Sequence, residues 1–372
     1  MAKVSLKNVC SLSGGDVIAV SDVSLEIEDR EFVVLAGPAP SGNSTLLRMI
    51  AGLEGISRGE IFIGDRRLND VAAPARDVGM VLATAALYPA MSVYENMAFT
   101  LRRRKFGATE IKKRVQDAAA ILSLERLLEQ MPGALDGEQQ QRVALGRAIV
   151  RQPKVLLFDE PLVNLRGKAR TLLRTEIVKL HQRLETTFVY ATDNPTDALA
   201  MGNRLVVMDE GVLQQSGAAS AVYRKPANLL VASFLGSPAM NLIHGTLRLE
   251  RDSLLFSEKE DGTIAFRIPL AERPALRDFA GQAVVLGIRP QDLEVLQVPK
   301  GQGRREGSFP AILDVVEPAG AETVLQLQTG AQMVACRTTQ AFEAKDTGRR
   351  MQFVLDLQQV HFFDPVSTLR IL

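Results

Sequence analysis

The chain has 372 residues, which suggests two or three domains, and its 46% hydrophobic content excludes a disordered protein. A formal net charge of +1 gives no overall attraction to nucleic acid or anionic lipid. Cys10 and Cys336 form no disulfide framework or metal-binding pattern, which fits a reducing cytosol. No run reaches the roughly 18 apolar residues of a membrane helix, so we expect the chain to serve a membrane only through a partner that spans it.

Residues 1–35 are predicted to form strands. The last of them, EFVVLAG, is a continuous apolar run of the kind found in strands buried on both faces. It is followed by a turn rich in Gly, Pro and Ser, GPAPSGNST, and then by an apolar helix that contains LLRMIAGLE. This order of strand, loop and helix predicts the first half of an α/β phosphate-binding unit.

The middle of the chain alternates between strands and helices. Short strands are expected within residues 60–83, and residues 91–130 carry a helical pattern. A further helix, EQQQRVALGRAIVRQ, leads to a second buried strand, KVLLFDEP, and helix 167–185 follows. This alternation predicts a mostly parallel sheet that is covered on both faces.

The pattern changes after about residue 235. Short strand-like runs separated by turns continue to the end and predict an all-β module such as a small barrel. The Gly, Ser and Pro residues of GSPAMN favour a domain boundary at this point. We therefore expect a first domain over residues 1–235 and a second over residues 236–372.

The turn after the buried strand follows the P-loop template G-x-x-x-x-G-K-[ST] in part. Gly37, Gly42 and Ser44 match the template, but Asn43 replaces its lysine. The lysine of the template contributes a charge-assisted hydrogen bond to the β- and γ-phosphates. Losing that bond costs about 1.5–3 kcal/mol, which lowers the affinity for the nucleotide roughly tenfold to hundredfold. Pro40 also removes a backbone N–H from the phosphate cradle. The alternative is a simple strand-to-helix turn.

Asp159 and Glu160 end the second buried strand, KVLLFDEP. Ligands bind at the carboxyl ends of strands in open α/β sheets. An aspartate there can hold Mg²⁺ through water, and a neighbouring glutamate can polarise an attacking water molecule. The apolar run before this pair and Pro161 behind it make the pair a stronger candidate site than two isolated carboxylates.

These segments resemble the ATPase subunits of carbohydrate-type ABC importers, the maltose and glycerol-phosphate class. The resemblance covers nearly the whole chain and rests on VSLKNV, EFVVLAGP, STLLRMIAGLE, ALYPAMSVYENMAF, QQRVALGRAIVRQPKVLLFDEPLVNL, VVMDEG, GSPAMN, GIRPQDLEV and HFFD. It implies an α/β P-loop nucleotide-binding domain with a helical subdomain at about 84–150. An all-β, OB-like (TOBE-like) regulatory domain is then expected to follow.

The resemblance also implies partners and cofactors. ATP and Mg²⁺ would lie between the P-loop of one ATPase subunit and the signature sequence of a second. The pair would drive two membrane-spanning permease subunits, served by a substrate-binding protein, from the cytoplasmic face of the plasma membrane. The cargo implied is a sugar, a polyol such as glycerol, or glycerol phosphate, and no nucleic acid is involved.

Site residues follow from the same resemblance. Catalytic positions fall on Glu160, which is retained, Asp193, which replaces a histidine, and Ala83, which replaces a glutamine. Ser44 and Asp159 are the Mg²⁺ positions. The nucleotide-binding positions are Ser13, Gly37, Pro38, Ala39, Pro40, Ser41, Gly42, Asn43, Ser44 and Thr45. The signature positions are Leu135, Asp136, Gly137, Glu138 and Gln139.

The departures from the family pattern fall on polar groups. Ser13 replaces an aromatic residue that stacks on adenine, and Arg166 replaces an aspartate. Asp136 and Glu138 place two carboxylates in the signature, where like charges at ~4 Å would cost on the order of 4 kcal/mol against phosphate. The apolar framework is intact, so the fold is expected to persist without the hydrolytic groups.

We therefore interpret the chain as a catalytically degenerate half of a heterodimeric ATPase pair. Its own site would bind ATP and Mg²⁺ weakly or not at all, and the second ATPase subunit would be a different protein. Two alternatives stay open at this point. The chain could be an active homodimeric ATPase that tolerates the changes, or a structural or regulatory protein that has kept the fold.

Overall fold

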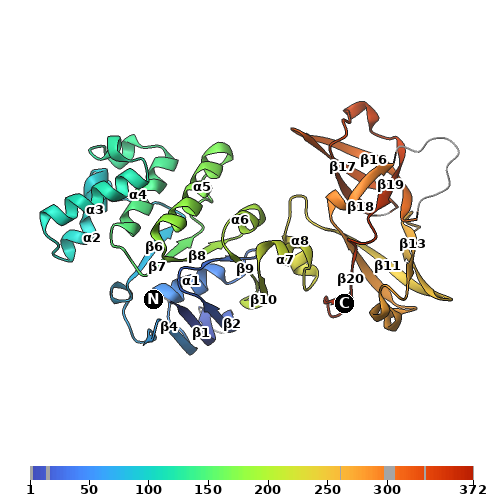
Figure 1. Ribbon diagram of the computed structural model, residues 1–372, viewed down its shortest axis with the longest axis horizontal. Helices are drawn as coiled ribbons and strands as arrows, with labels where there is room; N and C mark the ends of the chain where they lie inside the picture. The colour runs from blue at the N-terminus through green and yellow to red at the C-terminus, as the bar shows by residue number, and fades with distance from the viewer. Residues whose placement is uncertain (1–2, 14–16, 260, 297–305, 331, 372) are drawn as a thin grey trace. The chain divides into compact units, whose positions relative to one another are not determined.

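The computed structural model describes residues 3–13, 17–259, 261–296, 306–330 and 332–371 (Figure 1). The chain divides into two compact units, Met1–Val222 and Tyr223–Leu372. The division falls inside the short helix α7 (Ala219–Arg224), earlier than the boundary expected near residue 235. Among the described residues, no helix combines the length and the apolar character that crossing a bilayer requires.

The central sheet of the first unit has the strand order β10-β9-β3-β8-β7-β6. All pairings in it are parallel except that of β10 with β9, so the predicted mostly parallel sheet is confirmed. Every residue of β3, β7 and β8 is buried, and the continuous apolar runs of β3 and β7 predict this for those two strands. The strands are β3 (Phe32–Ala36), β6 (Val78–Leu82), β7 (Val155–Asp159), β8 (Thr187–Thr192), β9 (Arg204–Asp209) and β10 (Val212–Gly217).

A second, antiparallel sheet completes the first unit. Its order is β2-β1-β4-β5, formed by β1 (Val4–Ser13), β2 (Val17–Ile27), β4 (Arg58–Ile63) and β5 (Arg66–Arg67). Side chains of this sheet, of helix α1 and of the central sheet share one apolar core, which includes Leu6, Ile27, Leu46, Ile50 and Leu35. Helix α1 is therefore held between the two sheets (Figure 1).

Helices α2, α3 and α4 gather at one end of the first unit (Figure 1). They lie within the predicted helical subdomain at about 84–150, whose limits stay a prediction. Helix α2 begins at a capping box between Ser92 and Glu95. The helices are α1 (Asn43–Ala51), α2 (Val93–Arg103), α3 (Ala108–Ile121), α4 (Gly137–Ile149), α5 (Gly167–Leu184) and α6 (Pro195–Ala200), with short 3₁₀ turns at Ala73–Ala75, Glu125–Leu127 and Pro132–Ala134.

The second unit begins in the last residues of α7 and contains helix α8 (Leu229–Phe234). The rest of it is built on two antiparallel sheets, which confirms the all-β prediction for this region. The two sheets enclose one core that includes Phe256, Phe309, Phe353 and Phe362. One sheet contains β13 (Ala265–Pro269), β12 (Ser253–Glu258), β11 (Asn241–Glu250), β14 (Ala283–Ile288), β20 (His361–Phe363) and β21 (Arg370–Ile371). The other contains β15 (Leu293–Leu296), β19 (Arg350–Leu355), β16 (Ser308–Ala319), β17 (Glu322–Gln328) and β18 (Met333–Thr338), and 3₁₀ turns lie at Pro274–Phe279, Pro290–Asp292 and Ala344–Asp346.

Candidate nucleotide site

The loop between β3 and α1 keeps the backbone of a phosphate cradle. A Cβ atom at Gly37 would overlap the carbonyl oxygen of Met208, so only glycine fits there. Gly42 caps α1 with φ 86°, a left-handed conformation, and a Cβ there would overlap the carbonyl oxygen of Ala19. The loop is further fixed by the N–H of Gly211, which donates to the carbonyl oxygen of Ser41 at 3.0 Å.

Asn43 opens helix α1 at the position where the template has its lysine. The residue is only 5% exposed, and its Oδ1 has no hydrogen-bond partner among the described residues. A buried polar atom without a hydrogen-bond partner lowers the stability of the fold. Asn43 also places a neutral amide at the N-terminus of α1, where the cradle would hold phosphate.

Ser44, Asp159 and Arg48 form a hydrogen-bonded group beside this loop. Ser44 Oγ donates to Asp159 Oδ1 at 2.6 Å, and Arg48 Nε donates to Asp159 Oδ2 at 3.1 Å. Burial opposes the charge of Arg48, but the Asp159 carboxylate outweighs it and raises the pKa of Arg48. A hydroxyl and a carboxylate side by side suit Mg²⁺, which prefers oxygen ligands. Ser44 and Asp159 thus lie together, and their role as Mg²⁺ positions stays a prediction.

Glu160 follows β7 directly, and its N–H donates to the carbonyl oxygen of Ala191 at 3.1 Å. Burial raises the pKa of Glu160, and the negative charges of Asp193 and Asp159 raise it further, while Arg170 and Arg48 oppose them. Asp193, the residue in the histidine position, is exposed. The site therefore brings a second carboxylate near Glu160 where the family pattern has an imidazole.

The backbone around Ala83, after β6, is held by two side-chain amides. Asn164 Nδ2 donates to the carbonyl oxygen of Ala83, and Gln141 Nε2 donates to that of Leu82, both at 2.9 Å. The Ala83 methyl group can neither bind a metal ion nor orient water. This segment keeps its backbone attachments to α4 and to the loop after β7 while lacking the polar side chain.

The signature residues form the N-terminus of α4. Asp136 caps the helix, and its Oδ1 accepts the N–H of Gln139 at 2.8 Å in a capping box. Glu138 Oε1 accepts from Arg142 Nη2 at 2.7 Å. Leu135 is buried, whereas Gly137 is exposed. Both carboxylates predicted to repel phosphate are thus engaged in hydrogen bonds within the chain.

The remaining predicted positions are less informative. Ser13 ends β1, and its side chain lies outside the described residues. Arg166 is exposed at the start of α5 and makes no capping hydrogen bond. Within the described ranges, no group of three or more His, Cys, Asp or Glu side chains could hold a metal ion. The other loop positions are Pro38 and Thr45, half-buried, and Ala39 and Pro40, exposed.

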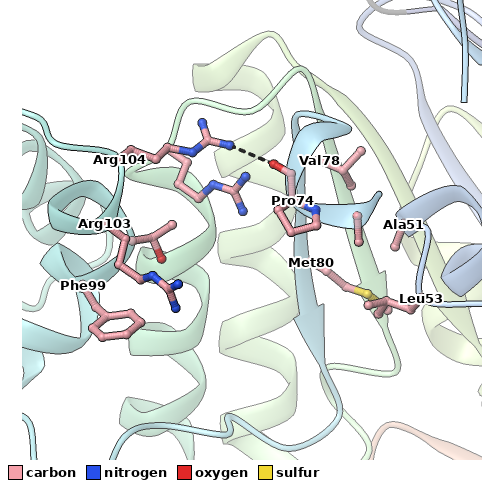
Figure 2. A pocket seen from close by; sticks show the side chains of 11 residues that line it. Ala51, Leu53, Pro74, Val78, Met80, Phe99, Arg103 and Arg104 are labelled. Atoms are coloured by element: carbon pink, nitrogen blue, oxygen red, sulfur yellow. Dashed lines mark hydrogen bonds between the residues drawn. The ribbon is translucent and has the colours of Figure 1, made fainter. Parts of the chain in front are cut away.

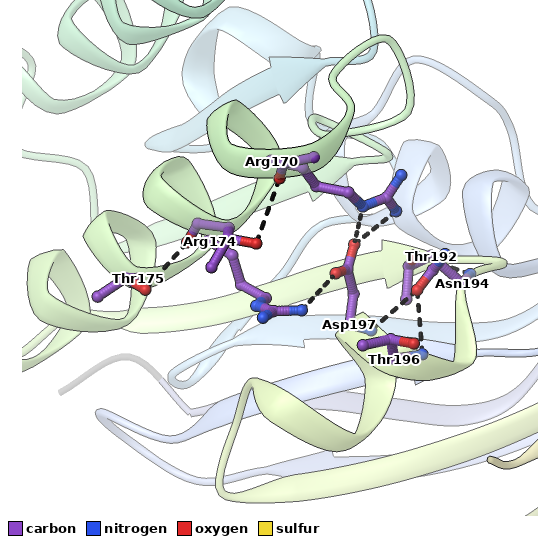
Figure 3. Close-up of polar contacts among 9 residues, drawn as sticks. Arg170, Arg174, Thr175, Thr192, Asn194, Thr196 and Asp197 are labelled. Carbon is purple, nitrogen blue, oxygen red and sulfur yellow. Dashed lines mark hydrogen bonds and ion pairs between the residues drawn. The ribbon is translucent and has the colours of Figure 1, made fainter. Parts of the chain in front are cut away.

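An ion-pair cluster between α5 and α6 was not predicted from sequence (Figure 3). Arg170 Nη2 and Arg174 Nη1 of α5 reach the two carboxylate oxygens of Asp197 on α6, at 2.7 and 3.3 Å. The Asp197 side chain is fully buried. Asn194 Oδ1 caps α6 by accepting the N–H of Thr196 and of Asp197. The Asn-Pro pair at 194–195 is typical of a capped helix start, so the sequence could have indicated the beginning of α6 but not the ion pairs.

An open pocket of about 510 Å³ lies near the other end of α1 (Figure 2). Apolar side chains from α1, β6 and α2 form part of its wall, and three arginines line it. Arg104 Nη2 donates to the carbonyl oxygen of Pro74 at 3.4 Å across this wall. The lining residues are Ala51, Leu53, Ala73, Pro74, Val78, Met80, Phe99, Thr100, Arg103, Arg104 and Arg151.

Comparisons with known proteins place this geometry in context. Residues 20–163 match the ABC transporter family and residues 236–293 match the MalK OB fold domain. The chain is 43% identical to the oligosaccharides import ATP-binding protein MsmX of Bacillus subtilis (strain 168), over 100% of both chains. It is 41% identical to the sn-glycerol-3-phosphate import ATP-binding protein UgpC of Yersinia pseudotuberculosis serotype I (strain IP32953), over 100% of this chain and 99% of UgpC.

A solved structure agrees with the cassette fold. The ATP-binding cassette MJ0796, in a dimeric post-hydrolysis state bound to ADP and Pi, superposes with a TM-score of 0.52 at 29% identity. The match covers 58% of this chain and 98% of MJ0796. The α/β cassette with an appended OB-type domain, as predicted, is confirmed.

Proposed function

The chain belongs to the ATP-binding proteins of ABC transporters, and from this membership we propose that it is the ATP-binding subunit of an importer for a sugar, a polyol or glycerol phosphate. The import proteins MsmX and UgpC, similar over their whole lengths, support this cargo class. The chain would act at the cytoplasmic face of the membrane with two permease subunits and a substrate-binding protein.

Its own ATP site is proposed to be degenerate, so that ATP and Mg²⁺ bind there weakly or not at all. The observation that carries this proposal is Asn43, a buried neutral amide with an unpaired oxygen at the helix N-terminus that would meet the phosphates. Family members bind ATP with Mg²⁺, and the Ser44–Asp159 pair retains the groups to hold the ion. Without a cation beside it, the cradle lacks the charge that would steady a γ-phosphoryl group.

A heterodimer follows from this degeneracy. A second, different ATPase subunit would supply an intact P-loop, and the signature of this chain, residues 135–139, would close over that nucleotide. The open pocket beside Phe99 and Arg103 is a concave surface on which a permease segment can dock, and this supports a role as a membrane-docking subunit. Hydrolysis would then take place in the site that combines the partner's P-loop with this signature.

ATP turnover by the purified full-length chain tests the proposal. We expect no activity above background, and we expect a tag on this chain to co-purify a distinct second ATPase subunit together with permease subunits. The retained Glu160 is the feature that favours the alternative, an active homodimer. Turnover of the purified chain at about one per second or more, the low end of ordinary enzymes, would establish that alternative.

A further inference from the structure

The guanidinium of Arg142 joins three elements near the signature. On α4 itself, Nη2 lies 2.7 Å from Glu138 Oε1, one helical turn back. The same Nη2 lies 2.6 Å from Glu176 Oε1 on α5, and Nη1 donates at 3.2 Å to the carbonyl oxygen of Leu122, the residue that caps the C-terminus of α3. The three charged side chains are only 15 to 30% exposed, so water screens this cluster less than it screens surface pairs.

Glu138 is placed where a negative charge would matter most. It is the second residue of α4, and the capping box between Asp136 and Gln139 occupies the N–H groups of those two residues. The N–H groups of Gly137 and Glu138 have no acceptor within the helix, because the first turn of a helix leaves its donors free. A carboxylate swinging over this turn would cover those donors and repel an incoming phosphate.

We propose that Arg142 is a positioning residue that draws the Glu138 carboxylate sideways, away from the nucleotide phosphates that meet the first turn of α4. The inference rests on the proposed function, in which this signature closes over a nucleotide held by another ATPase subunit. Arginine suits the role because its planar fork engages two carboxylates and a carbonyl oxygen at once, which lysine cannot do with the same geometry. The signature can therefore tolerate an acidic residue at position 138.

The test is a series of variants in the transporter isolated through a tag on the full-length chain. Arg142→Gln should raise the KM for ATP about tenfold, the effect expected of one released charge about 10 Å from the phosphates at an effective dielectric near 20. The double variant Glu138→Gln/Arg142→Gln should recover most of that loss, because no charge remains to be restrained. Arg142→Lys should fall between Arg142→Gln and the wild type.

Glu176→Gln is the matched control, because it removes the other carboxylate that Arg142 binds. It should leave the KM for ATP within about twofold of the wild type, because Arg142 still holds Glu138 in this variant. The affinity of the same complexes for a fluorescent ATP analogue, measured in parallel, should follow the same order. Circular dichroism melting of each purified chain identifies any variant that fails to fold.

Equal losses in Arg142→Gln and in the double variant would overturn the inference and leave Arg142 as a structural link between α3, α4 and α5. A loss in Glu176→Gln as large as that in Arg142→Gln would overturn it as well. The proposed function fails on a different result, ATP turnover by the isolated chain. In that case the same four variants still test Arg142, on the activity of that chain.

Discussion

Gly37 shows how tightly single residues shape the phosphate loop. The overlap that its Cβ would make with the Met208 carbonyl oxygen involves backbone, which cannot move aside cheaply. We expect Gly37→Ala to lower the free energy of unfolding by about 3 kcal/mol, at the upper end of overpacking effects. Gly133→Ala, where a Cβ meets nothing within 4 Å, is the control, expected within about 0.5 kcal/mol of the wild type. Equal urea midpoints for the two variants would contradict this.

Glu160 carries a pH-dependent effect on stability. Because burial and Asp193 raise its pKa, the folded chain binds the proton more tightly than the unfolded chain. Its contribution to stability is complete below the unfolded pKa of about 4.3 and is lost as the pH rises through the higher folded pKa. Glu160→Gln, permanently neutral, is therefore expected to raise the melting temperature at pH 7 and to lose this advantage near pH 4.

The control for this prediction is Glu129→Gln, at an exposed position in the same unit. It should leave the melting temperature unchanged across the same pH range. A lower melting temperature for Glu160→Gln at pH 7 would contradict the sign. Melting curves at several pH values, followed by circular dichroism, provide the measurement.

The position of the phosphate loop could be predicted from the sequence, whereas the orientation of the Glu138 side chain could not. The spacing of Gly37, Gly42 and Ser44 was sufficient to locate the loop, since the template fixes backbone geometry. The sequence could not decide where the Glu138 carboxylate points, because its partner Arg142 also pairs with Glu176 of α5, a residue far along the chain. Side-chain pairing across helices depends on their packing, which no local pattern encodes.

Helices α5 and α6 are joined by a buried ion-pair cluster at Asp197 (Figure 3). Removing its charge leaves two arginines without their shared partner, and breaking a buried pair costs about 3–5 kcal/mol. We expect Asp197→Asn to destabilise the chain by about 3 kcal/mol in urea denaturation. Glu185→Gln is the control, because the Arg30–Glu185 pair is exposed and should contribute under about 1 kcal/mol. Similar losses in both variants would argue against the cluster as a link.

At the level of elements, continuous and alternating strands differed in how well they could be predicted. The apolar runs of β3 and β7 indicated buried strands, and both lie in the interior of the sheet. The separate antiparallel sheet was not predicted, because β1 pairs both with its neighbour β2 and with β4, beyond the phosphate loop. Alternation specifies a half-buried face but not the partner strand.

At the scale of the whole molecule, the second unit includes residues 223–235, which precede the boundary expected from the sequence. The stabilities of two fragments can test this assignment. Arg289 is 3% exposed, donates to the carbonyl oxygens of Tyr223, Ala232 and Leu235, and lies 3.9 Å from the Tyr223 ring centroid. A fragment of residues 236–372 would lose all of these partners and expose an unpaired charge in a buried place. It should therefore be at least about 2 kcal/mol less stable than residues 223–372.

Arg289→Met in both fragments is the control for this comparison. The substitution removes the charge that needs the lost acceptors, so the difference between the two fragments should shrink. Equal stability of the unsubstituted fragments in urea would favour the boundary expected near residue 235. The sequence placed the boundary at the Gly, Ser and Pro residues of GSPAMN, whereas the contacts of Arg289 extend the folded unit toward the N-terminus.

The central claim is that the cradle has lost its cation. Titration of the full-length chain with ATP and Mg²⁺ tests it most directly, comparing the wild type with Asn43→Lys. Gln152→Lys serves as the control, since it adds the same charge at an exposed position that precedes β7, away from Asp159 at the strand's far end.

We predict that Asn43→Lys binds ATP about tenfold to hundredfold more tightly than the wild type, the value of one charge-assisted hydrogen bond, and that Gln152→Lys does not. Equal affinity of the wild type and a folded Asn43→Lys chain for ATP would contradict the account.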